Sequence, residues 1–257
     1  MAGDYERYRP GYPDRFVQAI LDYAEPPVLT AIEIGAGTGK ATRSFAEHRS
    51  IGPAGNGQRI AVTAVDPDRA MLAELDRQTA GLPVTTICAT LEALPATGPF
   101  DLLYAASAWH WTDPDTRWQL AAHLVRPGGT VAFFDGGRRL IDDRIADALT
   151  AARRTMLSDE KFRRPGSESI GPNWVLDGLR DAPQFVDATE RILTDDQTIP
   201  AADFVGLLST QSSYLQLAPA DRAEVLRRIE AVLPPEVDVH RELGIQLARR
   251  ASDPAER

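Results

Sequence analysis

The chain has 257 residues, of which 43% are hydrophobic and 25% are charged, and it carries a net charge of -9 with an isoelectric point near 5.0. These values predict one globular domain, and the acidic balance argues against a broad nucleic-acid interface, which needs a basic face. The single Cys88 excludes an intrachain disulfide, the first residues hold no apolar signal core, and no apolar run reaches membrane-spanning length. We therefore expect a cytoplasmic protein that binds neither nucleic acid nor a membrane.

Aromatic and basic residues alternate near the start of the chain, where residues 5–13 read Tyr-Glu-Arg-Tyr-Arg-Pro-Gly-Tyr-Pro. The next residues predict a helix at 14–23. Its apolar face holds Phe16, Ile20 and Leu21. Tyr8 and Tyr12 suit a lid over a ligand, because a tyrosine ring covers apolar surface while its hydroxyl stays hydrogen-bonded. The alternative is an arm that aromatic packing pins to the surface.

A glycine-rich stretch follows at residues 31–42, where an apolar run with one acid, Glu33, leads into glycines at positions 35, 37 and 39. This pattern predicts a buried strand that turns sharply into a helix at 41–48. Such a turn brings backbone close to a ligand, and the helix start offers free N–H groups, so a nucleotide-like cofactor is indicated. A dinucleotide fingerprint would need glycine where the chain has Lys40. The alternative is a tight turn that binds nothing.

An acid stands at the end of the second predicted strand, at 59–65, which a Gly/Pro/Asn-rich loop at 50–58 precedes. Asp66 in this place can accept hydrogen bonds from both hydroxyls of a ribose. Its alternative role is to cap the helix predicted at 69–78, although Asp68 could fill that role.

The third predicted strand, at 83–88, ends in Cys88, which we expect to be a small core residue rather than a nucleophile. The fourth, at 100–106, leads into the loop Ser-Ala-Trp-His-Trp-Thr-Asp-Pro at 107–114. Ligands of open α/β sheets lie outside the carboxyl ends of the strands, so this loop should face the reacting group. His110 in it could accept a proton at neutral pH, or could simply be hydrogen-bonded.

The remaining pattern predicts alternating helices and strands. The expected helices are at 117–124, 142–162, 174–181, 201–217 and 219–233, and the expected strands are at 130–135, 185–199 and 237–248, with a tight turn at 125–129 before the first of them. Scattered histidines give no paired ligand spacing, so no metal site is expected.

Four motifs carry a resemblance to one family. Glu-Ile-Gly-Ala-Gly-Thr-Gly at 33–39 closely resembles the first motif of class I S-adenosylmethionine-dependent methyltransferases. Residues 5–13 resemble the N-terminal segment of the trans-aconitate and ubiquinone-pathway members of that group, the methyltransferase type 11 domain. Ala-Thr-Leu-Glu-Ala-Leu-Pro at 89–95 resembles a Gly-Asp-Ala-Glu-x-Leu-Pro stretch, with Ala-Thr in place of Gly-Asp, and residues 124–131 resemble the turn before the fifth strand.

This resemblance implies an α/β fold: a Rossmann-like, seven-stranded, mostly parallel sheet with helices on both faces, an antiparallel last strand and a helical cap inserted at the carboxyl edge. It implies a single methyltransferase domain. Within it we expect residues 1–29 to form a lid and helix, 30–136 the cofactor-binding core, 137–170 and 200–235 the cap, and 171–199 and 236–250 the C-terminal part of the sheet.

The implied cofactor is S-adenosyl-L-methionine, with S-adenosyl-L-homocysteine as product. The residues expected to bind it are Glu33, Gly35, Ala36, Gly37 and Gly39 at the glycine turn, Asp66 and Pro67 at the ribose, Thr90 and Leu91 at the adenine, and Ser107. Thr90 replaces the family's aspartate and is the weaker acceptor for the adenine amino group.

The expected reaction is in-line methyl transfer to a small-molecule acceptor, a small acid or secondary metabolite, with His110 as a possible general base. Orientation and water exclusion supply much of the rate of such a displacement, so no obligatory catalytic signature is expected. The expected acceptor contacts are Tyr8, Tyr12, Trp109, His110, Trp111 and Tyr214. The alternatives are a cofactor-binding enzyme that moves no methyl group, or a binding or regulatory module. The sequence does not indicate an oligomeric state.

Overall fold

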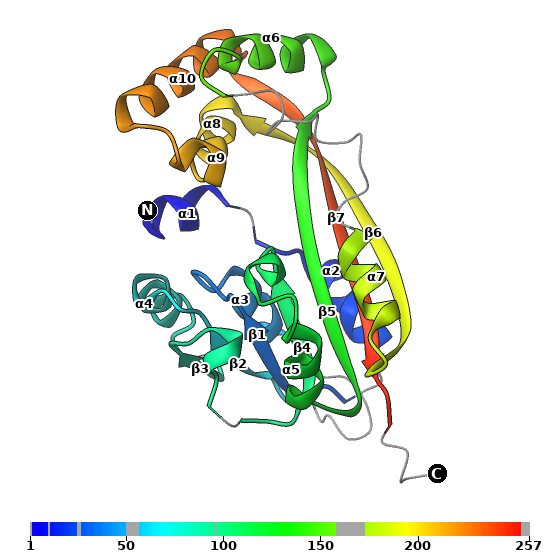
Figure 1. The fold of residues 1–257 in the computed structure, drawn as a ribbon. Coiled ribbons are helices and arrows are strands. Elements are labelled where there is room, and N and C mark those ends of the chain that lie inside the picture. Colours follow the sequence, from blue (N-terminus) through cyan, green and yellow to red (C-terminus); the bar gives the residue numbers. More distant parts are fainter. Residues whose placement is uncertain are drawn as a thin grey trace. The chain divides into compact units, whose positions relative to one another are not determined.

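The computed structural model describes residues 2–9, 11–24, 27–49, 57–95, 97–157 and 173–252. Within these ranges seven strands form one sheet, in the order β3-β2-β1-β4-β5-β7-β6 (Figure 1). The strands are β1 (Thr30–Ile34), β2 (Ala61–Val65), β3 (Val84–Ile87), β4 (Phe100–Ala106), β5 (Val125–Leu140), β6 (Phe185–Pro200) and β7 (Glu236–Arg250).

The described helices alternate with these strands along most of the chain. They are α1 (Ala2–Tyr8), α2 (Asp14–Tyr23), α3 (Lys40–Glu47), α4 (Arg69–Gln78), α5 (Arg117–Leu124), α6 (Asp143–Arg153), α7 (Asn173–Asp181), α8 (Ala201–Ser209), α9 (Ser212–Leu215) and α10 (Pro219–Val232), with short 3-10 turns η1 (Leu91–Ala93) and η2 (Trp109–Trp111). None of them is long and apolar enough to cross a membrane.

The chain divides into two compact units. The first, here called the core unit, comprises residues 11–135, 171–192 and 244–257. The second, here called the helical unit, comprises residues 1–10, 136–170 and 193–243. Strands β5, β6 and β7 are long enough to contribute residues to both units.

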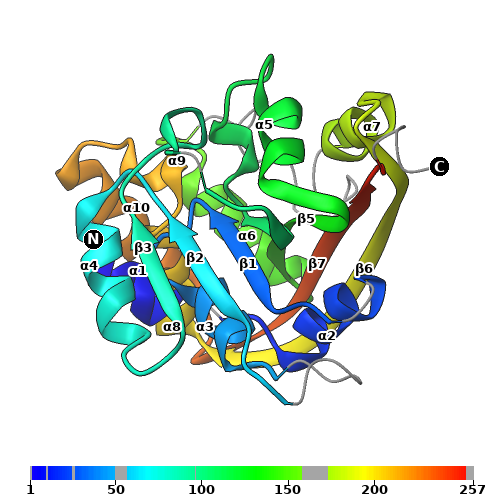
Figure 2. The ribbon, with the colours of Figure 1, turned by 90° about the horizontal axis from the view of Figure 1, so that it is seen from below.

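Five strands of the core unit are parallel. Strand β1 pairs in parallel with β2 and β4, β2 with β3, and β4 with β5. The middle of such a sheet is buried on both faces, which explains why β1 and β4 are mostly apolar. Figure 2 shows β3, β2 and β1 side by side, with β3 at the edge of the sheet.

Strand β7 is antiparallel to both of its neighbours. On the β5 side, the Ile141 backbone N donates to the Asp238 carbonyl, while Gly136 lies against Leu243. On the β6 side, side-chain hydrogen bonds join Thr198 to Asp238 and Glu190 to Gln246. In both pairs the numbers rise on one strand as they fall on the other, which is the antiparallel register. The predicted fold, a mostly parallel seven-stranded sheet with an antiparallel last strand, is therefore confirmed.

The two faces of the core sheet bury different residues, because alternate side chains of a strand point to opposite faces. One face packs Ile32 and Leu103 against α5 and α7. The other face stacks Phe45 of α3 on Tyr104 with ring centroids 4.2 Å apart, and sets Phe16 of α2 edge-on to Phe134. The apolar face predicted for α2 is confirmed for Phe16 and Ile20, which are fully buried, and Val17 joins them in place of the half-buried Leu21.

A carboxyl group is buried on the face of the sheet that carries Tyr104. Glu33 of β1 is 1% exposed and accepts hydrogen bonds from the Thr42 hydroxyl at 2.5 Å and the Tyr104 hydroxyl at 3.1 Å. Burial raises the pKa of Glu33 from about 4.5 to about 8, because desolvation outweighs these hydrogen bonds and the charge of Asp66 adds to it. The group ties α3 and β4 to β1 as a largely protonated acid.

The helical unit has its own apolar core. In the segment after residue 142, Leu149 and Leu157 are buried there, and Ile145, Ala152 and Met156 pack against this core. Helix α6 ends at Arg153, whereas residues 158–162 of the predicted helix lie outside the described residues. The helix predicted at 201–217 is broken into α8 and α9 at Thr210 and Gln211.

Two local predictions are wrong. Cys88 is exposed rather than buried, because β3 ends at Ile87 on the edge of the sheet. The tight turn expected at 125–129 is part of β5, with an irregular register against the start of β4 and a positive φ of 73° at Gly128. The loop predicted at 50–58 falls mostly outside the described residues.

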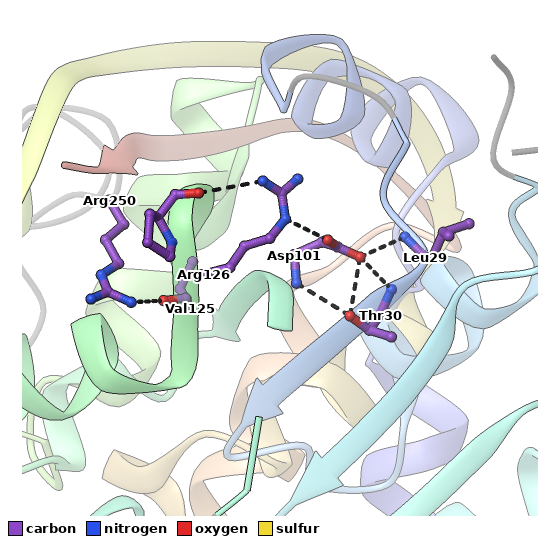
Figure 3. Close-up of polar contacts among 7 residues, drawn as sticks. Leu29, Thr30, Asp101, Val125, Arg126 and Arg250 are labelled. Carbon is purple, nitrogen blue, oxygen red and sulfur yellow. Dashed lines mark hydrogen bonds and ion pairs between the residues drawn. The ribbon is translucent and has the colours of Figure 1, made fainter. Parts of the chain in front are cut away.

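A polar cluster joins the amino ends of three strands (Figure 3). The Asp101 carboxylate accepts from the backbone N–H groups of Leu29 and Thr30, both at 2.9 Å, and from the Arg126 Nε at 2.6 Å. Burial alone would raise the pKa of Asp101, but the hydrogen bonds from Arg126, Leu29 and Thr30 outweigh it and lower the pKa. Arg250 of β7 donates to the Val125 carbonyl at 2.6 Å beside this cluster.

Removing the charge of Asp101 should destabilise the fold. Asp101→Asn is expected to lower the free energy of unfolding by about 2–3 kcal/mol near neutral pH, since it weakens several hydrogen bonds to a partly buried carboxylate. Because the folded pKa is depressed, this stabilisation is present above the unfolded pKa of about 3.9 and is lost as pH falls through the folded value. Urea unfolding measures both effects. The exposed Asp177→Asn serves as control, and an equal loss in the two variants would contradict the account.

Glu33 should produce a pH dependence of the opposite sign. Between about pH 4.5 and 8 the folded protein keeps a proton on Glu33, whereas the unfolded chain has lost it. The free energy of unfolding therefore falls as pH rises through that window. Glu33→Gln keeps the shape and removes the titration, so it should flatten the fall seen between about pH 6 and 8. The exposed Glu47→Gln on α3 should keep the wild-type slope, and identical slopes for the two variants would disprove the burial of an acid.

Candidate functional site

The turn after β1 is held in a conformation that needs glycine. Gly35, Gly37 and Gly39 have φ values of 73°, 55° and 85°, a region that side chains disfavour. A Cβ on Gly35 would lie 2.3 Å from the Ala108 Cβ, and one on Gly39 would lie 2.7 Å from the Leu75 Cγ. These two glycines therefore allow the close packing of the turn against its neighbours.

Gly37 differs from the other two glycines. A Cβ there would meet no described atom within 4 Å, so the middle of the turn faces open space. Its backbone N donates to the Asp66 Oδ2 at 2.8 Å, while the Asp66 Oδ1 accepts from the Asp68 backbone N at 2.8 Å. Asp66 thus joins the turn to the end of β2. Each of its oxygens keeps a lone pair for a further donor.

Asp66 does not cap α4. The Asp68 carboxylate accepts from the backbone N–H groups of Ala70 and Met71 at 2.7 and 3.4 Å, so Asp68 fills the capping role. Asp66 is 9% exposed, and the neighbouring Pro67 is exposed.

The segment after β3 presents Thr90, which is exposed, and buries the Leu91 side chain in the apolar core. Glu92 of η1 accepts from the Asp113 backbone N at 2.8 Å, so this segment is tied to the loop after β4.

A strained serine stands at the end of β4. Ser107 has a φ of 54°, which is uncommon for a residue with a side chain, and its hydroxyl donates to the Asp135 Oδ1 at 2.6 Å. The sequence analysis did not single out Asp135, although its position at the end of the strand predicted at 130–135 parallels that of Asp66 at the end of the second strand. The pair adds a carboxylate and a hydroxyl to the carboxyl edge of the sheet.

The Trp-His-Trp residues at 109–111 lie partly in the core and partly on the surface. Trp109 is 3% exposed and packs on Phe133 and Trp118, with ring centroids 4.3 and 5.5 Å away. Neighbouring rings thus cover the indole of Trp109, which was predicted to contact an acceptor. Trp111 is 77% exposed, and the exposed His110 lies beside it with ring centroids 4.8 Å apart.

Arg117 holds the backbone of the loop after β4 in place. Its guanidinium donates to the backbone carbonyls of Trp109, Thr112 and Asp113 at 2.8–3.3 Å, and it lies 4.8 Å from the Trp174 ring centroid. No sequence signal singled out this arginine, because its partners are backbone carbonyls that become adjacent only in the fold. It fixes the direction in which His110 and Trp111 project.

The three predicted tyrosines occupy different places. Tyr12 packs in the core unit against Phe16 and Phe134, both at 5.1 Å between centroids. Tyr8 in the helical unit lies over Gly206 of α8, where any Cβ would meet its ring. Tyr214, which was also predicted to contact an acceptor, is 0% exposed and lies in the apolar core of that unit.

The start of the chain is pinned to the rest of the helical unit. Arg9 donates to the Thr210 hydroxyl and carbonyl at 3.0 and 3.3 Å, and its guanidinium lies 5.3 Å from the Tyr5 ring centroid. The geometry thus matches the packed arm, which was the alternative to a lid.

Comparison with known proteins finds similarity to methyltransferases over residues 31–129. The sequence profile of a family described as a methyltransferase domain matches residues 31–129. An uncharacterized methyltransferase of Mycobacterium tuberculosis is 37% identical over 129 residues, which cover 49% of this chain and 46% of that protein. The chain thus spans about half the length of the mycobacterial relatives that it matches.

Solved structures share the fold over nearly the whole chain. A candidate type II methyltransferase from Anaeromyxobacter dehalogenans has a TM-score of 0.66 at 24% identity, and the match covers 96% of this chain and 100% of that one. Phosphoethanolamine N-methyltransferase 2 of Haemonchus contortus, in complex with phosphomonomethylethanolamine and S-adenosylhomocysteine, has a TM-score of 0.53 at 15% identity, covering 98% of this chain and 57% of that one.

The glycine turn after β1, the strand order and the family match over residues 31–129 agree with one another. Residues 31–129 are therefore similar to a methyltransferase domain, and the chain shares its fold with solved methyltransferases.

Proposed function

We propose that this protein transfers a methyl group from S-adenosyl-L-methionine to a small-molecule acceptor. The observation that carries the proposal is the open face of the turn at Gly37, directly beside a carboxylate at the end of β2. An amino-acid tail needs close backbone approach, and a ribose needs a fixed acceptor for its hydroxyls. The two features stand side by side here, so these residues fit the cofactor.

In this proposal the glycine turn, with Ala36 at its start, holds the methionyl part of the cofactor. Asp66 accepts from the ribose hydroxyls with the lone pairs left free by its backbone donors, and Pro67 adjoins the sugar. Thr90 and the Leu91 backbone edge the adenine, and Ser107 contributes from the end of β4. Glu33 is buried against Thr42 and Tyr104, so we assign it the positioning of the turn.

The cofactor supplies an activated methyl group, and the protein orients the two reactants and excludes water from them. Held reactants can gain about 7–11 kcal/mol of the barrier from orientation alone, so a proton acceptor is needed only for acceptors that lose a proton. His110 is the group proposed for that role, because it is exposed on the loop after β4 and Arg117 fixes that loop. Trp111 projects beside it and offers an apolar contact.

The acceptor is proposed to be a small acid or secondary metabolite, as the resemblance of residues 5–13 to trans-aconitate-type enzymes suggests. The Haemonchus contortus enzyme, whose fold this chain shares, was solved with a small phosphorylated amine, which supports a small acceptor. We propose that residues 30–136 hold the cofactor and that residues 137–170 and 200–235 select the acceptor.

Cofactor binding should depend on Asp66. Calorimetry with S-adenosyl-L-methionine should show binding to the wild type, and Asp66→Ala should weaken it at least about tenfold, since two hydrogen bonds to a charged group are lost. Asp76→Ala, an exposed acid on α4, should bind like the wild type. Wild-type binding that Asp66→Ala leaves unchanged would contradict the assignment.

Methyl transfer itself is tested with methyl-labelled cofactor and a panel of small metabolites, read by mass spectrometry. The proposal predicts labelled product together with S-adenosyl-L-homocysteine. Turnover of a metabolite without label would identify a non-methylating enzyme, and absence of cofactor binding would identify a module that has lost the donor.

A further inference from the structure

A carboxylate lies next to the residue proposed to contact the adenine. Glu92 follows Thr90 by two positions, and the backbone N of Ala93 donates to the Thr90 carbonyl at 3.2 Å, which closes the short turn η1. The Leu91 side chain between them is buried in the apolar core, whereas the side chains of Thr90 and Glu92 are exposed. The apolar residue thus anchors the turn, and its two polar side chains remain accessible.

The loop after β4 holds Glu92 in place. The Glu92 Oε1 accepts from the Asp113 backbone N at 2.8 Å, and the Asp113 carbonyl accepts from the Arg117 Nε at 3.2 Å. Arg117 is 6% exposed, and its guanidinium also donates to the carbonyls of Trp109 and Thr112. The backbone to which Glu92 is hydrogen-bonded is therefore fixed by a buried side chain.

The Thr90 hydroxyl is also hydrogen-bonded to Glu92, and this bond has a fixed direction. Burial would raise the pKa of Glu92, but hydrogen bonds from the Asp113 N–H, its own backbone N–H and the Thr90 hydroxyl outweigh burial and the charge of Asp113, so the pKa is lowered. Glu92 is therefore an ionised carboxylate at neutral pH, and a carboxylate only accepts hydrogen bonds. The Thr90 hydroxyl must donate its single hydrogen to Glu92, which leaves the lone pairs on its oxygen for another donor.

We propose that Glu92 is a positioning residue that orients the Thr90 hydroxyl as an acceptor for the adenine amino group of the cofactor. A free hydroxyl can donate or accept, but a hydroxyl whose hydrogen is bound to a carboxylate only accepts, and that bond also polarises its oxygen. The adenine amino group is a donor, whereas an oxo group at the same position of a purine is an acceptor. Thr90 and Glu92 together thus replace the aspartate of the family motif. This inference rests on the proposed function for the identity of the cofactor.

The first experiment compares two ligands that differ at one position of the purine. Calorimetry measures the binding of S-adenosyl-L-homocysteine and of its 6-oxo analogue, S-inosyl-L-homocysteine, to the wild type and to three variants of the full chain. Thr90→Val removes the hydroxyl. Glu92→Gln keeps an oxygen for the Asp113 N–H and offers an amide N–H to Thr90, which frees the Thr90 hydrogen for the oxo group. Asp115→Asn is the matched control, because Asp115 is an exposed acid whose charge acts on Arg117 as that of Glu92 does.

The wild type and Asp115→Asn should bind the adenine ligand at least about tenfold more tightly than the 6-oxo ligand, because an oxo group would face the lone pairs of Thr90. Thr90→Val and Glu92→Gln should reduce this preference to about threefold or less. The ratio of the two affinities cancels any general loosening of the site. A wild type without preference, or a preference that Glu92→Gln leaves unchanged, would overturn the inference while binding itself still supports the proposed function. If the wild type binds neither ligand, both the proposed function and this inference fail.

The second experiment measures methyl transfer to an accepted acceptor at varied cofactor concentration. The adenine is remote from the transferred methyl group, so its contacts should stabilise the ground state and the transition state equally. Thr90→Val and Glu92→Gln should therefore raise the KM for the cofactor about threefold or more and leave kcat within about twofold of the wild type. A fall in kcat at unchanged KM would show that Glu92 acts through the loop after β4 instead, and would overturn the inference.

Discussion

The structure depends on a backbone turn that only glycine can make. At this turn β1 ends and α3 begins, and the chain takes positive φ values at three alternate positions. The backbone N–H groups of Gly35 and Ala36 donate to the Val65 carbonyl at 2.8 and 2.9 Å, and that of Gly37 donates to Asp66. The turn is therefore fixed to the end of β2 before any ligand binds, and preorganisation of this kind reduces the entropy cost of binding.

Polar groups divide between the two ends of the core sheet. At the amino ends, Asp101 gathers backbone donors and Arg126 into a cluster that stabilises the strands. At the carboxyl ends, Asp66 accepts hydrogen bonds from the backbone, and Asp135 accepts one from the strained Ser107. Ligands of open α/β sheets bind at the carboxyl ends, so we attribute stability to the first group and recognition to the second.

Local patterns predicted the elements that build the core unit. Strand β4, α4 and α5 coincide with their expected ranges because apolar spacing, an acid at a helix start and a glycine turn act over a few residues. The positions of Gly35–Gly39 and Asp66 followed from the same local signals. Asp68 as helix cap was likewise readable from its place before α4.

Features that depend on distant partners could not be read in this way. Trp109 follows a strand in a predicted loop, and only the fold shows that Phe133 and Trp118 cover its ring. Helix α1 is packed through Tyr8 on Gly206, from the far part of the chain. The approach of Gly136 to Leu243 depends on the register of strands separated by about a hundred residues of sequence, and no local period encodes such a register.

The central claim is that the glycine turn and Asp66 together hold the cofactor at the carboxyl edge of the sheet. A crystal structure of the protein with S-adenosyl-L-homocysteine tests it most directly. The account predicts ribose hydroxyls within hydrogen-bonding distance of the Asp66 carboxylate and the amino-acid tail against the backbone at Gly37. Binding at another edge of the sheet, or a ribose that makes no contact with Asp66, would contradict it.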